Sequence, residues 1–102
     1  MNALVETQRD KLIDLCREYA VKKLELFGSA AVGDFDLEKS DLDFLVDFEP
    51  CTPVLHAERY LGLLAAMQYS FGRNIDLVEI RAMRNPYFIQ SIESDRQIVY
   101  AK

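Results

Sequence analysis

The nine residues 40–48, SDLDFLVDF, carry the clearest secondary-structure signal in the chain. Leu42, Phe44, Val46 and Phe48 alternate with positions that are mostly acidic. Because side chains two residues apart leave the same face of a β-strand, this pattern predicts a strand with one apolar and one acidic face. The apolar face is therefore expected to belong to the core.

Helices and further strands alternate on both sides of this segment. Apolar spacing predicts strands over residues 21–27, 75–80 and 97–100 and helices over residues 7–19, 53–71 and 86–94. Strands separated by helices predict an α/β fold, with a small mixed sheet of three to four strands flanked by helices. With 102 residues the chain has room for one core, so we expect a single domain over residues 1–102.

Local signals mark the ends of two of these helices. Thr7 and Asp10 resemble a capping box at the start of the first helix. Thr52 followed by Pro53 is typical of a helix start, and Gly72 is typical of a helix end. The helix between Thr52 and Gly72 is the longest that the sequence predicts.

Composition excludes several classes of protein. No apolar run approaches the roughly 20 residues of a membrane span, and the N-terminus lacks the pattern of a signal peptide, so we expect a cytoplasmic protein that does not contact a membrane. Two cysteines, Cys16 and Cys51, are too few and too far apart for a zinc site or a disulfide framework. With 17 acidic and 12 basic residues the net charge is −5, which disfavours direct binding of nucleic acid.

Three aspartates on two predicted strands are candidate metal ligands. Asp41 and Asp43 leave the same face of one strand, roughly 6.6 Å apart, and Asp76 lies early in the next strand between two apolar residues. An acidic run alone is typical of a solvated loop and a polar strand face. If the two strands are neighbours, however, the three carboxylates meet at one edge, and hard oxygen ligands of this kind suit Mg²⁺ or Mn²⁺.

A Gly28-Ser29 turn follows the strand over residues 21–27. Small residues there allow backbone N–H groups and the Ser29 hydroxyl to approach a phosphate closely. A Gly-Ser pair after a strand is usually only a turn. A phosphate-binding turn beside a cluster of carboxylates, in contrast, is typical of enzymes that transfer phosphoryl or nucleotidyl groups.

The residues of these motifs resemble a known family. FGSAAVG (residues 27–33) followed by SDLDFLV (residues 40–46) is similar to the signature of the DNA polymerase β-type nucleotidyltransferases, in their minimal branch. NPYFI (residues 85–89) and the IVY segment (residues 98–100) resemble the usual ending of these small proteins. The resemblance covers nearly the whole chain and implies the nucleotidyltransferase fold.

The resemblance also implies roles for individual residues. Asp41, Asp43 and Asp76 would be the catalytic residues and would hold two Mg²⁺ ions, with Mn²⁺ as an alternative. Nucleotide binding would fall to Gly28 and Ser29, together with Ser40 beside the first aspartate.

The acceptor implied by the resemblance is another protein. Minimal nucleotidyltransferases are similar to antitoxins that act with a HEPN-domain toxin, and members transfer AMP to a Tyr hydroxyl of that toxin. We therefore expect transfer of AMP from ATP, or from another nucleoside triphosphate, to a partner toxin.

One departure from the family pattern keeps a second function open. Many minimal members have an arginine at the position of Val32, directly before Gly33, and this chain lacks that positive charge. The alternative is an antitoxin of weak or no catalytic activity that neutralises its toxin by binding alone. The sequence leaves the oligomeric state open, homo-oligomers included.

Overall fold

A computed structural model describes residues 2–32, 41–93 and 96–102 of the chain. Its elements, in chain order, are α1 (Ala3–Thr7), α2 (Arg9–Glu18), β1 (Val21–Phe27), α3 (Ser29–Val32), β2 (Leu42–Phe48), α4 (Pro53–Phe71), β3 (Ile75–Glu79), the 3₁₀ helix η1 (Ile80–Ala82), α5 (Pro86–Glu93) and β4 (Gln97–Ala101).

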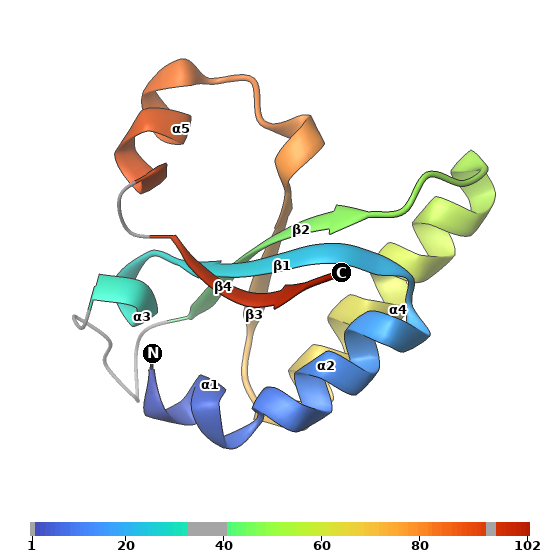
Figure 1. Cartoon of the computed structure of the whole chain (residues 1–102), viewed down its shortest axis with the longest axis horizontal. Coiled ribbons are helices and arrows are strands. Elements are labelled where there is room, and N and C mark those ends of the chain that lie inside the picture. The colour runs from blue at the N-terminus through green and yellow to red at the C-terminus, as the bar shows by residue number, and fades with distance from the viewer. Residues whose placement is uncertain (1, 33–40, 94–95) are drawn as a thin grey trace.

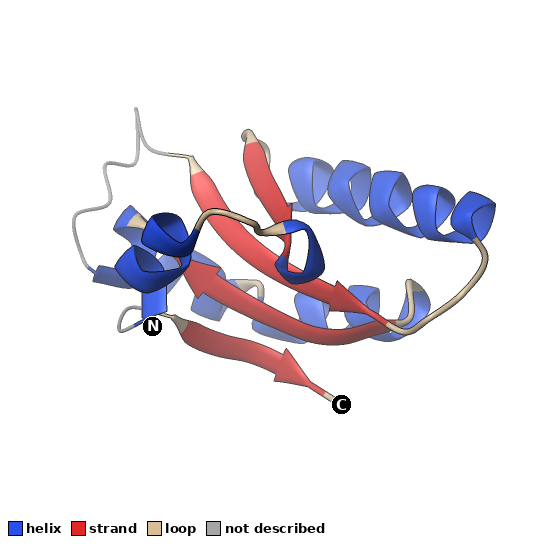
Figure 2. Ribbon diagram, turned by 90° about the horizontal axis from the view of Figure 1, so that it is seen from above, coloured by secondary structure: helices blue, strands red, loops and turns tan. Residues whose placement is uncertain are grey.

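The four strands form one mixed sheet in the order β3-β2-β1-β4 (Figure 2). β1 pairs antiparallel with β2 and with β4, whereas β2 and β3 run parallel, connected by the long helix α4. The predicted α/β fold, with a small mixed sheet and flanking helices, is therefore confirmed.

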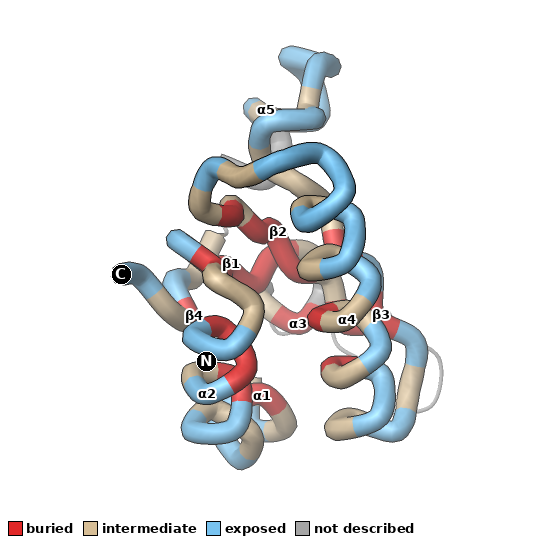
Figure 3. The backbone as a smooth tube through the Cα atoms, turned by 90° about the vertical axis from the view of Figure 1, so that its right-hand side faces the viewer, coloured by how far each residue is buried: buried red, intermediate tan, exposed pale blue. Residues whose placement is uncertain are grey.

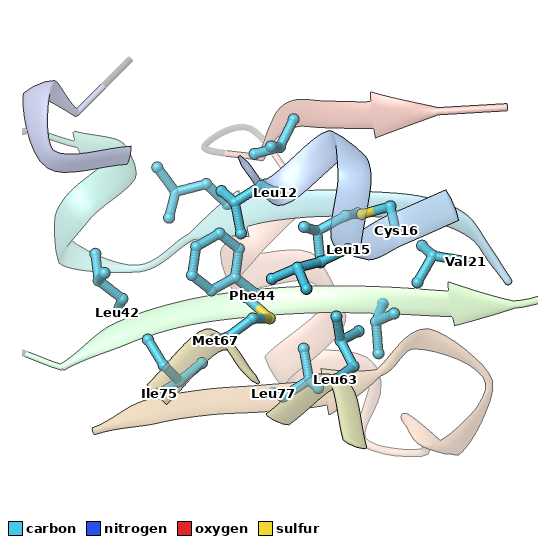
Figure 4. Close-up of a cluster of buried hydrophobic side chains, with 14 of the residues drawn as sticks. Leu12, Leu15, Cys16, Val21, Leu42, Phe44, Leu63, Met67, Ile75 and Leu77 are labelled. Carbon is cyan, nitrogen blue, oxygen red and sulfur yellow. The ribbon is translucent and has the colours of Figure 1, made fainter. Parts of the chain in front are cut away.

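Helices α1, α2 and α4 cover one face of the sheet, and α5 lies on the opposite side (Figure 1). Between the sheet and the three helices lies the main core, which holds the alternating apolar residues of β2 (Figure 4). Leu42, Phe44 and Val46 are fully buried there, beside Leu63 and Met67 of α4. The predicted alternation of β2 is thus confirmed.

The other face of the sheet carries a smaller apolar cluster. Phe27 and Leu45 are buried there, with Val78 and Met83 packed against them. Phe88 of α5 meets Phe27 in an edge-to-face contact, with ring centroids 6.0 Å apart. This contact anchors α5 to the second face, at the end where β1 leads into α3.

One predicted helix was wrong in its extent and its cap. Residues 7–19 were expected to form a single helix, but the segment contains the end of α1 and all of α2. Thr7 closes α1 instead of capping α2, because its hydroxyl donates to the Ala3 carbonyl oxygen. Asn2 provides the N-cap of α1 through its side-chain oxygen, and Gln8 at the start of α2 makes no side-chain cap.

The predicted ends of α4 are confirmed. The Thr52 hydroxyl accepts from the Leu55 N–H, Pro53 begins the helix, and Gly72 ends it with a left-handed backbone.

The buried residues lie along the strands and the inner sides of the helices, as Figure 3 shows. Within the described ranges, no helix combines the length and the apolar character needed to cross a membrane.

Candidate active site

Asp43 and Asp76 are directly opposite each other on the parallel strands β2 and β3. Both project from the sheet face that α5 shares, because each alternates along its strand with residues of the main core. Phe27 is the antiparallel partner of Asp43 on the other side, so Asp43 lies between the end of β1 and Asp76. The condition under which the carboxylates would meet, that the two strands are neighbours, is therefore met.

The Asp76 carboxyl group perturbs that of Asp43. Partial burial, followed by the charge of Asp76, a hydrogen bond with Asp76 and the charge of Asp41, raises the pKa of Asp43 to about 6. All four causes disfavour a second negative charge at this position. A cation between the carboxylates would offset the repulsion.

Gly28 lies against the Asp43 carboxylate. Its backbone has φ of +73°, and a Cβ built on it would lie 2.3 Å from Asp43 Oδ2. Only a residue without a side chain allows the end of β1 to approach the carboxylate so closely. The turn between β1 and α3 and the Asp43–Asp76 pair therefore form one site.

The structure gives less detail for the other predicted site residues. Asp41 is exposed and immediately precedes β2, where its charge acts on Asp43. Ser29 is the first residue of α3, whose backbone continues the Gly28 turn. Ser40 and Gly33 lie outside the described residues.

Two of the three expected carboxylates are in contact, and the third is at their edge. Across the described segments, no three aspartate, glutamate, histidine or cysteine side chains are arranged as a preformed metal site. Asp41 precedes the paired part of β2, so its carboxylate is not held by the strand ladder.

The comparisons with known proteins agree with this geometry. The model of the nucleotidyltransferase domain family matches residues 9–99. This chain belongs to that family. The nucleotidyltransferase is also 37% identical over 78 residues to a Methanocaldococcus jannaschii protein named "Putative protein adenylyltransferase", covering 76% of each chain.

Solved structures show the same fold. A protein described as a "putative minimal nucleotidyltransferase" is 29% identical, with a TM-score of 0.66, and the match covers 90% of this chain and 89% of the other. A complex of a tri-AMPylated HEPN toxin with an MNT antitoxin from Shewanella oneidensis matches at 19% identity, with a TM-score of 0.59. That match covers 95% of this chain and 72% of the other.

The site of this nucleotidyltransferase fits a divalent cation in its donor chemistry. The donors are carboxylate oxygens, which Mg²⁺ and Mn²⁺ prefer. A proton on Asp43 relieves the repulsion between Asp43 and Asp76, and a bound cation would relieve the same repulsion. The small Gly28 leaves room beside Oδ2 that a side chain would occupy.

Gln97 of β4 contacts α3, the helix that follows Gly28, and was not singled out from the sequence. Its side-chain Nε2 donates to the Ala31 carbonyl oxygen of α3 at 3.2 Å, which ties β4 to the segment that follows Gly28. A glutamine at the start of a short edge strand gives no sequence signal of this role, because the contact joins residues 66 positions apart.

A buried ion pair lies on the same face of the sheet. Glu25 is 3% exposed, and Arg96 donates to both of its carboxylate oxygens, from Nε at 3.0 Å and from an η nitrogen at 2.6 Å. Burial would raise the pKa of Glu25, but the hydrogen bonds and charge of Arg96, with Lys23, lower it overall. The pair fastens the start of β4 to β1.

A cavity near His56 is separate from Asp43 and Asp76. About 420 Å³ in volume, it lies between the end of β2, the start of α4 and η1, and its lining includes Asp47, His56, Glu79 and Arg81. His56 pairs with Glu79, and Arg81 pairs with Asp47 at 2.9 Å. These polar groups of the cavity therefore engage one another.

Proposed function

We propose that this nucleotidyltransferase transfers AMP from ATP to a hydroxyl group, that of a tyrosine, on a partner HEPN-domain toxin and thereby acts as its antitoxin. The observation that carries the proposal is the Asp43–Asp76 pair in contact with the Gly28 turn. Carboxylates beside a small-residue turn combine a cation site with a phosphate site.

Asp41, Asp43 and Asp76 would hold one or two Mg²⁺ ions, with Mn²⁺ as an alternative. When bound, the ions would polarise the phosphate oxygens and neutralise the charge that develops on the leaving pyrophosphate. The raised pKa of Asp43 supports this assignment, because the site favours a positive charge between the carboxylates.

The chain's own residues bind the triphosphate and handle the proton. Gly28 and Ser29 would present backbone N–H groups to the phosphates, and Ser40, next to Asp41 in the sequence, is the third proposed nucleotide-binding residue. The acceptor oxygen forms a bond to the α-phosphorus, the bond from that phosphorus to the bridging oxygen breaks, and pyrophosphate leaves. Asp76 accepts the proton of the acceptor hydroxyl.

The choice of acceptor rests on related proteins. The Shewanella oneidensis complex joins an MNT antitoxin to a HEPN toxin that carries three AMP groups, and its antitoxin shares the present fold. The Methanocaldococcus jannaschii relative is named for transfer to protein.

A second candidate is an antitoxin that neutralises by binding alone. Val32, which replaces the arginine of many minimal family members, favours this alternative. Here the aspartates would be structural, and both proposals place the chain in the cytoplasm beside its toxin.

Co-expression with a HEPN-domain toxin separates the two candidates. We expect the wild-type chain to restore growth and Asp43→Asn to fail, because an amide is a poorer cation ligand than a carboxylate. Asp14→Asn on the exposed side of α2 is the matched control and is expected to restore growth.

Intact mass of the purified toxin provides the second readout. The toxin from cells with the wild-type chain is expected to carry AMP, and the toxin from cells with Asp43→Asn is not. Restored growth with Asp43→Asn, together with an unmodified toxin in both cases, would overturn transfer and support neutralisation by binding.

A further inference from the structure

The outward side of α4 carries a row of apolar residues that no described element covers. Val54, Leu61 and Tyr69 are 72%, 62% and 92% exposed, and Ala57 and Ala65 between them are also exposed. Successive members are three or four positions apart, so all five lie on one side of the helix. We call these five residues the α4 stripe.

The stripe is the reverse of the buried side of the same helix. Leu63 and Met67 face the core and are fully buried, with Tyr60 and Leu64 packed beside them. α4 is therefore apolar on two opposite sides, whereas a surface helix normally has one apolar side. The exposed turns of α4 can be followed in Figure 3.

The neighbouring helix α2 provides an internal comparison. Its exposed residues are all charged: Asp10, Lys11, Asp14, Arg17 and Glu18. The exposed residues of α4 include a single charge, Glu58. Isolated exposed apolar residues need no explanation, but an aligned row marks an interaction surface.

The order of residues in the stripe is nearly symmetric about Leu61. Ala57 and Ala65 are four positions before and after it, and Val54 and Tyr69 are seven before and eight after. Two copies of α4 packed antiparallel would therefore set Leu61 against Leu61, Ala57 against Ala65, and Val54 against Tyr69. A surface that matches itself in this way is what a two-fold interface requires.

Charge acts against association of two copies. With a net charge of −5, two copies of the chain repel each other in general. Glu58, four positions after Val54 and three before Leu61, is the one exposed charge on the stripe's side of α4, so few charges are brought together there. The two small alanines allow the helices to approach closely. From Val54 to Tyr69 the stripe is roughly 22 Å long, at about 1.5 Å per residue.

We propose that the chain forms a two-fold homodimer through the α4 stripe, with the two α4 helices packed antiparallel about Leu61. This arrangement leaves both candidate active sites open, because α4 covers the sheet face opposite to the one that carries Asp43 (Figure 1). The dimer would thus present two acceptor-binding faces to a partner. The proposal does not depend on the transfer reaction.

The first test is the mass of the full chain in solution by sedimentation equilibrium. We expect a concentration-dependent dimer for the wild type. Leu61→Glu places two like charges at the two-fold axis and is expected to raise the dimer dissociation constant at least about thirtyfold. Gln90→Glu on α5 is the matched control, because it replaces a neutral exposed residue and gives the same change in charge, and it is expected to leave the dimer intact.

Cysteine cross-linking tests the antiparallel arrangement in a Cys51→Ser background, in which the buried Cys16 remains. Leu61→Cys is expected to form a disulfide dimer on mild oxidation. Val54→Cys and Tyr69→Cys are each expected to form no disulfide when separate and to cross-link when mixed. Circular dichroism of each variant establishes that it folds.

A wild-type chain that is monomeric at every concentration would overturn the proposal. Cross-linking of Val54→Cys with itself would overturn the antiparallel arrangement. If the wild type is monomeric and Leu61→Glu instead weakens binding of the partner toxin, the α4 stripe is a surface for that toxin, and the homodimer is wrong.

Discussion

Asp43 of β2 is the direct register partner of Asp76 on the parallel strand β3, with the Gly28 backbone against its carboxylate. The three residues come from three separate elements of the fold. Because parallel pairing fixes which residues are opposite each other, the sheet itself sets the spacing of the two carboxylates. The candidate active site is therefore a property of strand register more than of any loop.

Removal of the Asp43 charge is expected to stabilise the chain and to abolish transfer. Burial and Asp76 raise the pKa of Asp43 from 3.8 to about 6, so the ionised form destabilises the folded chain at neutral pH. After allowance for solvent screening, Asp43→Asn should raise the free energy of unfolding at pH 7.5 by about 1 kcal/mol, in the absence of divalent cations. Transfer should fall at least about a hundredfold.

Urea unfolding with chelator present measures the first effect, and Asp14→Asn on the exposed side of α2 is the control. The control is expected to change neither stability nor transfer. An Asp43→Asn chain that is less stable than wild type would contradict the repulsion argued here.

Substitutions at two glycines with similar backbone angles distinguish the effect of backbone strain on stability from an effect on transfer. Gly28 and Gly72 both have positive φ, +73° and +63°, but a Cβ at Gly28 would clash with Asp43 and one at Gly72 would meet nothing within 4 Å. Each change to alanine should cost about 1–2 kcal/mol of unfolding free energy from backbone strain. Only Gly28→Ala is expected to abolish transfer, since it displaces the Asp43 carboxylate. Equal transfer by the two variants would show that the Gly28 contact is not needed.

Acidic pH is expected to lower the free energy of unfolding through protonation of Glu25. The ion pair with Arg96 lowers the pKa of Glu25 in the folded state below its ordinary value of 4.5. Its contribution is therefore fully present above that value and is lost as pH falls through the lower folded pKa. Glu25→Gln should lower the unfolding free energy at pH 7 by about 3 kcal/mol, and this difference should shrink in more acidic solution.

The control for this prediction is Glu6→Gln, which removes the exposed pair between Glu6 and Arg9. Its cost should stay under about 1 kcal/mol. Chemical unfolding over a range of pH checks both variants, and a Glu25→Gln difference that does not vary with pH would be inconsistent with an ionised Glu25.

Gln97 is expected to position the nucleotide-binding turn without contacting the nucleotide. Gln97→Met keeps a similar volume but removes the hydrogen bond to the Ala31 carbonyl. The loss of one such bond should raise KM for ATP about threefold to tenfold with little change in kcat. Gln90→Met on the exposed side of α5 serves as the control, and unchanged KM in Gln97→Met would exclude the positioning role.

Much of the fold could be predicted because local patterns dominate it. The alternation in residues 42–48 placed β2 and its two faces, and Thr52, Pro53 and Gly72 fixed the ends of α4. The break between α1 and α2 could not be predicted, because the apolar spacing continues across it. From the sequence alone, Thr7 can be the last residue of one helix or the N-cap of the next, and the structure shows the first.

The candidate site was predictable as a set of residues but not as a geometry. Acidic residues at Asp41, Asp43 and Asp76 were visible in the sequence, whereas the direct opposition of two of them depends on the register of β2 and β3. The contributions of Gln97 and Arg96 depend on contacts between residues 66 and 71 positions apart. Spacing along the chain carries no information on such contacts.

The most direct test of the central claim is transfer of label from ATP in a lysate that contains the partner toxin, with Mg²⁺ present. ATP labelled at the α-phosphorus and ATP labelled at the γ-phosphorus are compared, with the wild-type chain and with Asp41→Ala/Asp43→Ala. We expect one protein band to gain the α-label and not the γ-label, and the double variant to lose this signal. Equal labelling by the wild type and the double variant, or no labelling by either, would rule out nucleotidyl transfer by this site.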